Sequence, residues 1–451
     1  MTVSLLARAE GIVSTVGIDC PDVEVRDRTI PFGAATGLGQ RLIEAGGAIG
    51  VVPVVPAGGV VGQRVIVGGT GEDAGESGDI HLVGAGWWGG VAIGRRPESW
   101  VGLDLDRDES IGPYVAACLA IAEVFLKVRA PQLLADRPGS WGWNSWFRSN
   151  EAIPADLGPS WDVLDLSENA LAGVGAVGAA WMHTVWSAPR ANGRIVVADA
   201  DAEGVSISNL NRGLLFRRAD VERPKATIAA EAAVGTISWL PFNGRFEAQD
   251  HRPRVLVSAV DNNRARDVLQ SLYSAYFVSG STRDLRAEVV VGGDPGVGAC
   301  LRCFNPPEVA VSDDELRARA ARDDSASLAV IAADLGVQVE SVEARLQPGS
   351  CDALSDRLLE RLRRKYGDEA PAQFAVGFGS VMAGVLLAAE TIRFAIDEEL
   401  WPSTASDRVT FQLQHPSAES NRVRAYFRDL RCPKCDGGVP ALPMWRARRA
   451  P

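Results

Sequence analysis

Short apolar runs alternate with longer apolar segments along the middle of the chain. The run VLDL at 163–166 precedes the segment LAGVGAVGAAWMHTVW at 171–186, and the apolar run Ile195–Ala198 follows it. Glycines interrupt the start of the longer segment, and the apolar residues after them have helical spacing. This is the pattern expected where a strand turns tightly into a helix. The pattern therefore predicts a strand, a turn, a helix and a second strand, which is the order of a βαβ unit.

A second pattern occurs twice. Gly112–Glu123 and Gly379–Glu390 are small-residue segments led by glycine, and they share alanine, leucine, alanine and glutamate at an offset of 267 residues. Each segment predicts an apolar helix. Internal repetition of this kind indicates two copies of one fold in the chain. The alternative is coincidence, because alanine-rich helices align readily.

The glycines of the predicted turn are candidate ligand-binding residues. Gly173, Gly175 and Gly178 form a GxGxxG sequence, and Asp201 lies 23 residues beyond Gly178. Such glycines let the backbone approach phosphate, while an acid at the end of the second strand can bind a ribose; Asp199 competes with Asp201 for this role. This much would also suit a dinucleotide oxidoreductase.

Further polar residues favour a triphosphate instead. They are Asn209, Arg212, Lys225, Asp261 and Asn262. Attack by a carboxylate on an α-phosphate needs cations and a carboxylate-held Mg²⁺ to neutralise the developing charge, whereas hydride transfer does not. The chain has only four lysines, so one at this position is informative. The alternative for Arg212 and Asp261 is a surface ion pair.

Together these motifs resemble the ThiF/MoeB-type adenylating enzymes, which include ubiquitin-activating enzymes. The pattern comprises GxGxxG, the acid, SNLNR at 208–212, the lysine and the DN pair, and it covers about 164–396. In layout the chain is most similar to the activating enzyme of bacterial ubiquitin-like conjugation (Bil-type) systems. The resemblance implies that Asp201 binds ribose, that Arg212 and Lys225 bind phosphate, and that Asp261 binds the Mg²⁺ of ATP.

The resemblance also implies the reaction and its partners. The chain would adenylate the C-terminal carboxylate of a ubiquitin-like protein and then form a thioester, which a conjugating enzyme would accept. Two alternatives stay open: a sulfur-carrier or peptide adenylyltransferase that stops at the acyl adenylate, and a non-enzymatic nucleotide-binding scaffold. The chain could be a monomer or a homodimer.

Four of the seven cysteines form two CxxC pairs. They are Cys300, Cys303, Cys432 and Cys435. Four thiolates suit a tetrahedral, structural Zn²⁺, but the 128 residues between the pairs exceed the spacing of a zinc ribbon, so a folded domain would have to bring them together. Redox motifs or unrelated buried thiols are the alternatives.

Of the remaining cysteines, Cys351 is the candidate nucleophile. It lies between the turn signal QPGS and a polar helix start, where a helix dipole favours the thiolate although Asp352 opposes it. The resemblance implies that a cysteine beyond the first CxxC pair accepts the acyl group; the alternative is an ordinary exposed thiol. We expect Cys118 to be a core residue and Cys20 to be a minor structural thiol.

The predicted fold class is α/β, with two Rossmann-like, ThiF-type halves. Residues 1–130 would be a degenerate, inactive half, because they lack SNLxR, the lysine and the DN pair. Residues 131–160, rich in tryptophan and proline, would be a linker, with Trp141, Trp143 and Trp146 packing between domains. The active domain would span 161–451, with a helical insertion at 312–365 and a zinc-bound C-terminal segment. Arg8, in the first predicted helix, could complete the ATP site.

Composition narrows the functional classes. The net charge of −11 argues against general nucleic-acid binding, and the helix-turn-helix-like part of the insertion lacks a basic recognition helix. No run of 18 apolar residues and no cleavable leader pattern occur, so we expect a cytoplasmic protein without membrane insertion. The basic tail ending in WRARRAP would be disordered or a partner contact.

Overall fold

The computed structural model describes residues 1–304 and 377–449 except 22, 26–30, 60–61, 69–77, 135–136, 234, 249–251, 284, 415–416, 431, 433 and 436–441. These residues belong to one of two units of the chain, and the other unit is 305–375. Cys351 and the predicted helical insertion at 312–365 therefore lie outside the described residues.

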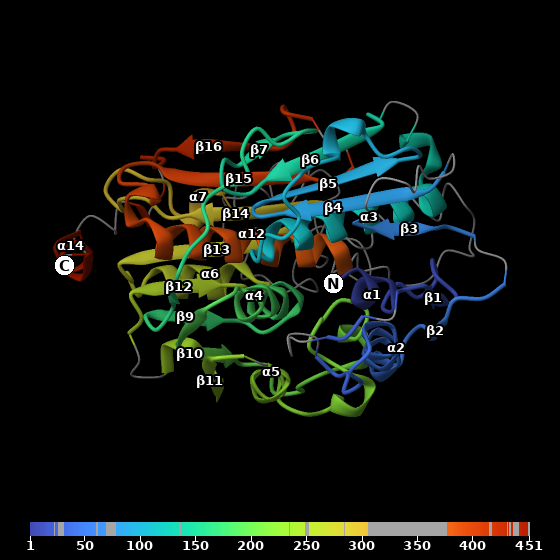
Figure 1. Cartoon of the computed structure of the whole chain (residues 1–451). Coiled ribbons are helices and arrows are strands. Elements are labelled where there is room, and N and C mark those ends of the chain that lie inside the picture. Colours follow the sequence, from blue (N-terminus) through green and yellow to red (C-terminus); the bar gives the residue numbers. More distant parts are fainter. Residues whose placement is uncertain are drawn as a thin grey trace, which may run out of the picture. The chain divides into compact units, whose positions relative to one another are not determined.

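The described residues contain a large sheet with the order β11-β10-β9-β12-β13-β14-β15-β16 (Figure 1). Strand β8 adds to this sheet by pairing with β10. The strands of the sheet are β8 Leu164–Asp165, β9 Asn169–Ala172, β10 Ala191–Asp199, β11 Ile237–Asn243, β12 Val255–Ser258, β13 Tyr276–Arg283, β14 Arg286–Val291, β15 Ser406–Gln412 and β16 Arg422–Tyr426. Pairing is parallel from β11 to β13 and antiparallel from β13 to β16. The two kinds of pairing give the sheet a Rossmann-like part and an antiparallel part.

The predicted βαβ unit is confirmed as β9, helix α4 (Ala176–Trp186) and β10. Its first strand is not the run VLDL, however. That run forms only the two-residue β8, whereas the wholly buried β9 leads directly into Gly173. Both segments are short and apolar, so periodicity alone could not choose between them; the strand that enters the turn is the one buried between β10 and β12.

The N-terminal part of the chain forms a second sheet with the order β3-β4-β5-β6-β7. Its strands are β3 Val65–Val67, β4 Ile80–Ala85, β5 Trp88–Ile93, β6 Ser140–Asn144 and β7 Ser149–Asn150. The pair β3–β4 is parallel and the later pairs are antiparallel, with helix α3 (Ile111–Arg129) between β5 and β6. The strands β12 to β16 repeat this order, with helix α12 (Gly377–Ile396) between β14 and β15. The topology agrees with the repeat predicted from the two glycine-led helices.

Residues 131–160 are not a linker. They contain β6 and β7, which complete the N-terminal sheet. The rings of Trp141 and Trp143 lie 6.2 and 5.2 Å from the ring of Phe411 on β15, so these two tryptophans do pack between the two sheets as predicted. Trp146 packs on Trp87, 5.0 Å away, and the guanidinium of Arg393, from the C-terminal half, lies 5.5 Å from its ring. Tryptophan spacing indicated the contact but could not reveal that the same segment pairs with β5.

Small residues allow the repeated helices to pack closely. A Cβ atom on Gly112 would lie 2.2 Å from the carbonyl oxygen of Trp88, and one on Gly384 would lie 2.5 Å from that of Val177. Both helices are long and apolar enough to cross a membrane, but 78% and 83% of their most apolar windows are buried in the fold, as in core helices. The glycine and alanine content of these segments is thus a packing requirement.

The remaining elements are short. They are α1 Thr2–Leu6, β1 Val16–Ile18, α2 Leu38–Ile49, β2 Val54–Pro56, α5 Lys225–Ala232, α6 Asn263–Gln270, α7 Leu301–Phe304 and α14 Leu442–Arg449, with 3₁₀ turns at Glu98–Trp100, Pro131–Leu133, Ile207–Asn209, Arg218–Asp220, Phe246–Ala248 and Glu398–Leu400. Strands β1 and β2 form a separate parallel pair.

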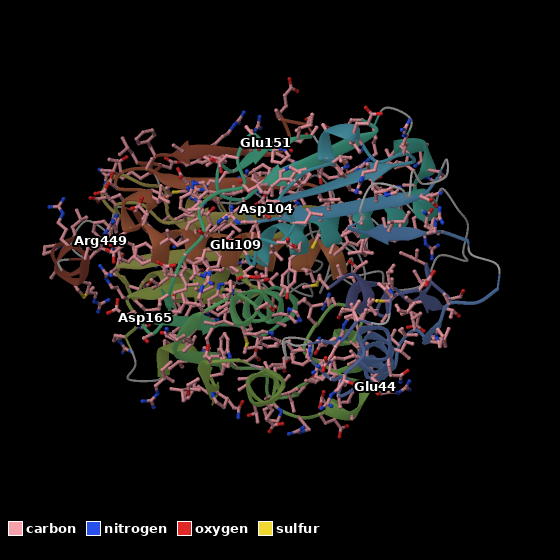
Figure 2. The ribbon with its side chains drawn as sticks, in the orientation of Figure 1. Glu44, Asp104, Glu109, Glu151, Asp165 and Arg449 are labelled. Atoms are coloured by element: carbon pink, nitrogen blue, oxygen red, sulfur yellow. The ribbon has the colours of Figure 1, made fainter. Side chains whose placement is uncertain are left out.

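The basic tail is ordered where the structure describes it. Helix α14 buries Trp445, and the guanidinium of Arg449 lies 4.9 Å from that ring and 4.5 Å from the ring of Tyr276. Figure 2 labels Arg449 near the C-terminal end of the described chain. Arg448 donates hydrogen bonds to the carbonyl oxygens of Leu272 and Tyr273. The expectation of a disordered tail is therefore wrong for 442–449, because its arginines bind aromatic rings and carbonyl groups that charge counting does not reveal.

Candidate nucleotide site and metal centre

The three glycines of the turn after β9 have different roles. Gly173 has φ +94°, and a Cβ there would lie 2.8 Å from the backbone of Ala259, while a Cβ on Gly178 would lie 2.0 Å from the carbonyl oxygen of Gly173. Gly175 has an ordinary φ of −76°, and a Cβ there would meet no described atom within 4 Å. Packing thus explains the first and third glycines, and the second leaves open space at the N-terminus of α4, where backbone N–H groups favour phosphate.

The two competing acids at the end of β10 are used differently. Asp199 accepts hydrogen bonds from the backbone N–H groups of Val174, at 2.7 Å, and of Asp201, at 3.0 Å. Asp201 forms an ion pair with Lys225 and is 39% exposed. Burial alone would raise the pKa of Asp201, but hydrogen bonds from Lys225 and from the N–H of Glu203 lower it. Asp199 therefore holds the glycine turn, whereas Asp201 leaves its carboxylate accessible beside a cation.

The loop that carries Arg212 is held from both sides. Asn209 accepts a hydrogen bond from the N–H of Ser206 at 2.9 Å and so caps the 3₁₀ turn before Arg212. From the N-terminal half, Arg8 donates to the carbonyl oxygens of Leu210, Leu214 and Phe216 at 2.5, 3.0 and 2.9 Å. Burial lowers the pKa of Arg8 to about 9. Arg8 and Asn209 therefore both form hydrogen bonds with the backbone of this loop. These bonds hold the two side chains against the loop and not toward open solvent.

The DN pair follows β12. Asn262 caps α6 by accepting a hydrogen bond from the N–H of Ala265 at 2.7 Å, and its amide nitrogen lies 3.3 Å from Asp261 Oδ1. Asp261 is exposed. The asparagine therefore fixes the start of the helix, and the aspartate presents an open carboxylate, which suits a hard cation such as Mg²⁺.

Topology brings these residues to one edge of the sheet. The strands β10, β9 and β12 are neighbours and parallel, so their carboxyl ends meet. The glycine turn, Asp201 and Asp261 follow those three ends. Arg212 lies in the connection from β10 to α5, and Lys225 is the first residue of α5. Successive strands are added on one side of β9 up to β11 and on its other side from β12 onward, and such switch points bind nucleotides in open α/β sheets. The donor set fits ATP with Mg²⁺.

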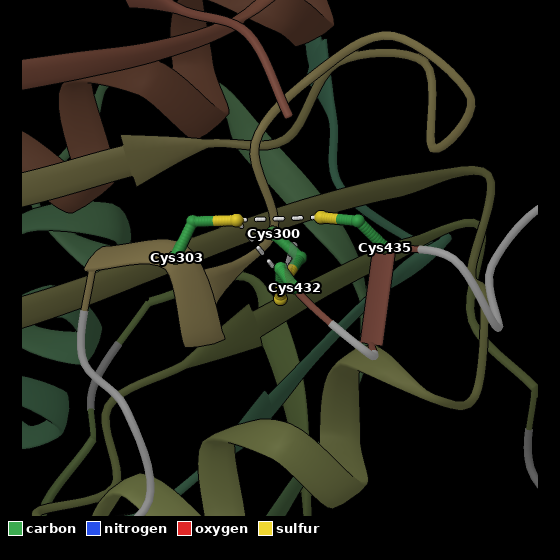
Figure 3. Close-up of side chains that lie close together, drawn as sticks. All are labelled: Cys300, Cys303, Cys432 and Cys435. Atoms are coloured by element: carbon green, nitrogen blue, oxygen red, sulfur yellow. Dashed lines mark hydrogen bonds between the residues drawn. The ribbon is translucent and has the colours of Figure 1, made fainter. Parts of the chain in front are cut away.

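The two CxxC pairs come together in the structure, as predicted (Figure 3). The sulfur of Cys300 lies 3.8 Å from that of Cys303 and 3.6 Å from that of Cys432, and Cys303 lies 3.3 Å from Cys435. All four sulfur atoms are within 4.8 Å of one another. A tetrahedral site with Zn–S bonds of about 2.3 Å places sulfurs about 3.8 Å apart, so the four cysteines fit one zinc ion.

The other two cysteines that the structure describes, Cys20 and Cys118, lie outside this cluster. Cys118 is buried on α3 as predicted, and burial raises its pKa. Cys20 is partly exposed. Sequence reasoning missed Lys434, which lies inside the second CxxC pair and contacts α6; the rarity of lysine in this chain was the signal that could have found it.

The chain was compared with known proteins. The model of the ThiF family matches residues 159–434, and that of the BilD N-terminal domain matches residues 14–140. Ubiquitin-like modifier-activating enzyme 7 of Mus musculus is 47% identical over 66 residues, which are 14% of this chain and 7% of the mouse protein. The chain thus matches only a small part of that relative.

Two solved structures, both of E. coli MccB, are similar to this chain. The complex of E. coli MccB with MccA-N7isoASN has 16% identity and a TM-score of 0.35, over 60% of this chain and 67% of the other. E. coli MccB alone has 14% identity and a TM-score of 0.35, over 79% and 94% of the two chains. The family match rests instead on the ThiF model, which covers more than half of the chain. The protein therefore belongs to the ThiF family of adenylating enzymes, and its N-terminal region matches the model of the BilD N-terminal domain.

Proposed function

We propose that the protein uses ATP and Mg²⁺ to adenylate the C-terminal carboxylate of a ubiquitin-like protein and then transfers the acyl group to Cys351. The observation that carries adenylation is the single sheet edge that combines open space at Gly175 with Lys225 and Asp261. The ubiquitin-like substrate is supported by the BilD-type region and by the segment shared with a ubiquitin-like modifier-activating enzyme.

The chemistry needs charge neutralisation more than acid–base groups. A carboxylate oxygen of the substrate attacks the α-phosphorus, the bond to pyrophosphate breaks, and an acyl adenylate forms. Arg212 and Lys225 would neutralise the phosphates, and Mg²⁺ held by Asp261 would stabilise the charge that develops on them. Because Lys225 is paired with Asp201, nucleotide binding would exchange that partner for phosphate and free Asp201 for the ribose.

The second step moves the acyl group to sulfur. The Cys351 thiol first loses its proton to solvent; the thiolate then attacks the acyl carbon, the bond from that carbon to AMP breaks, and AMP leaves. A conjugating enzyme would then take the modifier by thiol exchange.

The test uses the full chain and the small β-grasp protein encoded nearest to its gene. ATP–pyrophosphate exchange should require that protein with its terminal glycine, and a reductant-sensitive adduct should form. Cys351→Ala should lose the adduct and keep exchange, while Cys118→Ala, the buried control, should keep both. Exchange without any adduct would favour an enzyme that stops at the acyl adenylate. No exchange with any acceptor would favour a nucleotide-binding scaffold.

A further inference from the structure

Helix α6 connects the two sites described above. It begins directly after Asp261 and Asn262 at the nucleotide edge, and its eight residues span about 12 Å. Its last turn lies at the cysteine cluster, where Leu269 packs in the same core cluster as Leu301 of α7. The helix thus carries the proposed metal-binding acid at one end and contacts the cysteine cluster at the other.

Both CxxC segments bind the last turn of α6. Lys434, between Cys432 and Cys435, donates to the carbonyl oxygen of Asp267 at 2.9 Å and to the hydroxyl of Ser271. Its ammonium group also lies 3.1 Å from Asp267 Oδ1, and the lysine side chain is only 13% exposed. In the other segment, the N–H of Leu301 donates to the side chain of Gln270 at 2.8 Å.

We propose that Lys434 is a positioning residue for Asp261, because it fixes the C-terminal end of α6 to the cysteine cluster and so sets the place of the carboxylate at the other end. This inference rests on the proposed role of Asp261 in binding Mg²⁺. An ammonium group that binds a carbonyl and a carboxylate of one helical turn restrains the helix along its axis, and Lys434 is itself restrained by the cysteines on either side.

If the contacts of Lys434 are lost, we expect Mg²⁺ binding to change rather than the binding of the nucleotide itself. The glycine turn and Lys225 lie on other elements, so loosening α6 should leave their contacts with ATP intact. Groups that orient a metal ligand from the outside change metal affinity by about 10–100-fold. We therefore expect a metal-specific defect when Lys434 loses its charge.

The experiment measures ATP binding by calorimetry as Mg²⁺ is varied. Lys434→Met should raise the Mg²⁺ concentration that gives half of the maximal change in ATP affinity by roughly tenfold, at the low end of that range. It should leave the zinc content and the ATP affinity in Mg²⁺-free buffer unchanged. Lys434→Arg should restore most of the Mg²⁺ response. The control is Lys127→Met. Like Lys434, Lys127 donates to a backbone carbonyl, that of Gly78, and to a side-chain oxygen, that of Gln63, but it lies on α3.

A double-mutant cycle tests whether the effect passes through Asp261. In an Asp261→Asn background, Lys434→Met should cause no further change in the Mg²⁺ response. An unchanged Mg²⁺ response in Lys434→Met, or an equal loss in the Asp261→Asn background, would overturn the inference. Because the binding assay needs no acceptor protein, absent pyrophosphate exchange in the wild type would contradict the proposed function and leave this inference standing.

Discussion

The two halves of the described unit solve the same packing problem with different charges. Glu123 on α3 and Glu390 on α12 occupy equivalent positions of the repeat, and each binds an arginine from the segment around β6. Arg137 binds Glu123 and also donates to the carbonyl oxygens of Leu413 and Gln414 beyond β15. Arg148 binds Glu390 and also Asp407 on β15, at 2.7 Å. Each arginine thus ties the N-terminal sheet to the C-terminal half.

The ionisation of the two glutamates differs because their counter-charges differ. Glu390 has a second arginine, Arg393, at 2.9 Å. Burial would raise the pKa of Glu390, but the two arginines lower it. For Glu123, with Arg137 alone, burial outweighs the arginine and the pKa is raised. The comparison teaches that the repeat preserves helix packing, while charges and chemical groups differ between the halves, as they do at the nucleotide edge.

The largest expected effect concerns the metal centre, which belongs to the C-terminal half. Cys432→Ser should reduce zinc below the one ion per chain expected for the wild type, lower the melting temperature and expose the segment after β16 to protease, because the metal joins two distant segments. Metal analysis, calorimetry and limited proteolysis check this. Cys20→Ser is the control, since Cys20 is a partly exposed thiol of the N-terminal half. Wild-type protein without zinc would contradict the assignment.

The second prediction tests whether the adenylation chemistry is confined to the C-terminal half. Asp261→Ala should lower ATP–pyrophosphate exchange at least about a hundredfold, because a metal-held charge at the transferring phosphate contributes several kcal/mol. Circular dichroism should show an unchanged fold. Asp106→Ala, an exposed acid of the N-terminal half, should leave exchange at the wild-type level. Exchange within about threefold of wild type in Asp261→Ala would remove that residue from the site.

The sequence predicted the main residues of these two sites but not the contacts that support them. Motif spacing was sufficient for the glycine turn and for the cysteine cluster, because each depends on a small number of residues with one chemical property. Spacing could not show that Asp199 and Asn209 bind loop backbone, or that Lys434 reaches α6, since those contacts depend on how distant segments pack. The strand pairing of β6 was missed for the same reason.

The paired glutamates provide the third test, on stability. Glu390→Gln should cost about 3–5 kcal/mol at pH 7, because it removes the carboxylate that pairs with Arg393 and leaves Arg148 with Asp407 as its counter-charge. Glu123→Gln should cost less, because the charged form of Glu123 is already disfavoured by burial. Urea denaturation gives both values. Equal costs would show that the number of counter-charges does not govern the difference.

The pH dependence of these variants should differ in sign. Since the pKa of Glu390 is lowered, its stabilising contribution is present above the ordinary glutamate pKa of 4.5 and is lost as pH falls through the lowered value. Since the pKa of Glu123 is raised, wild-type protein loses stability from this group as pH rises above 4.5. The gap between wild type and Glu390→Gln should therefore narrow in acid, and the Glu123→Gln gap should widen.

The smallest effect on stability, and the cleanest separation of packing from chemistry, is expected at Gly175. Gly175→Ala should change the free energy of unfolding by less than about 0.5 kcal/mol, because its φ of −76° suits alanine and the new Cβ meets no described atom within 4 Å. ATP affinity should nevertheless fall, since the methyl group would enter the space left for phosphate.

Gly173→Ala is the contrasting variant, because φ +94° and a 2.8 Å approach to Ala259 should destabilise the fold itself. Calorimetric titration with ATP and urea denaturation on both variants separate the two outcomes. If Gly175→Ala bound ATP as tightly as the wild type, the open space at the start of α4 would not be the phosphate site, and the nucleotide would have to approach this edge through Lys225 and Arg212 alone.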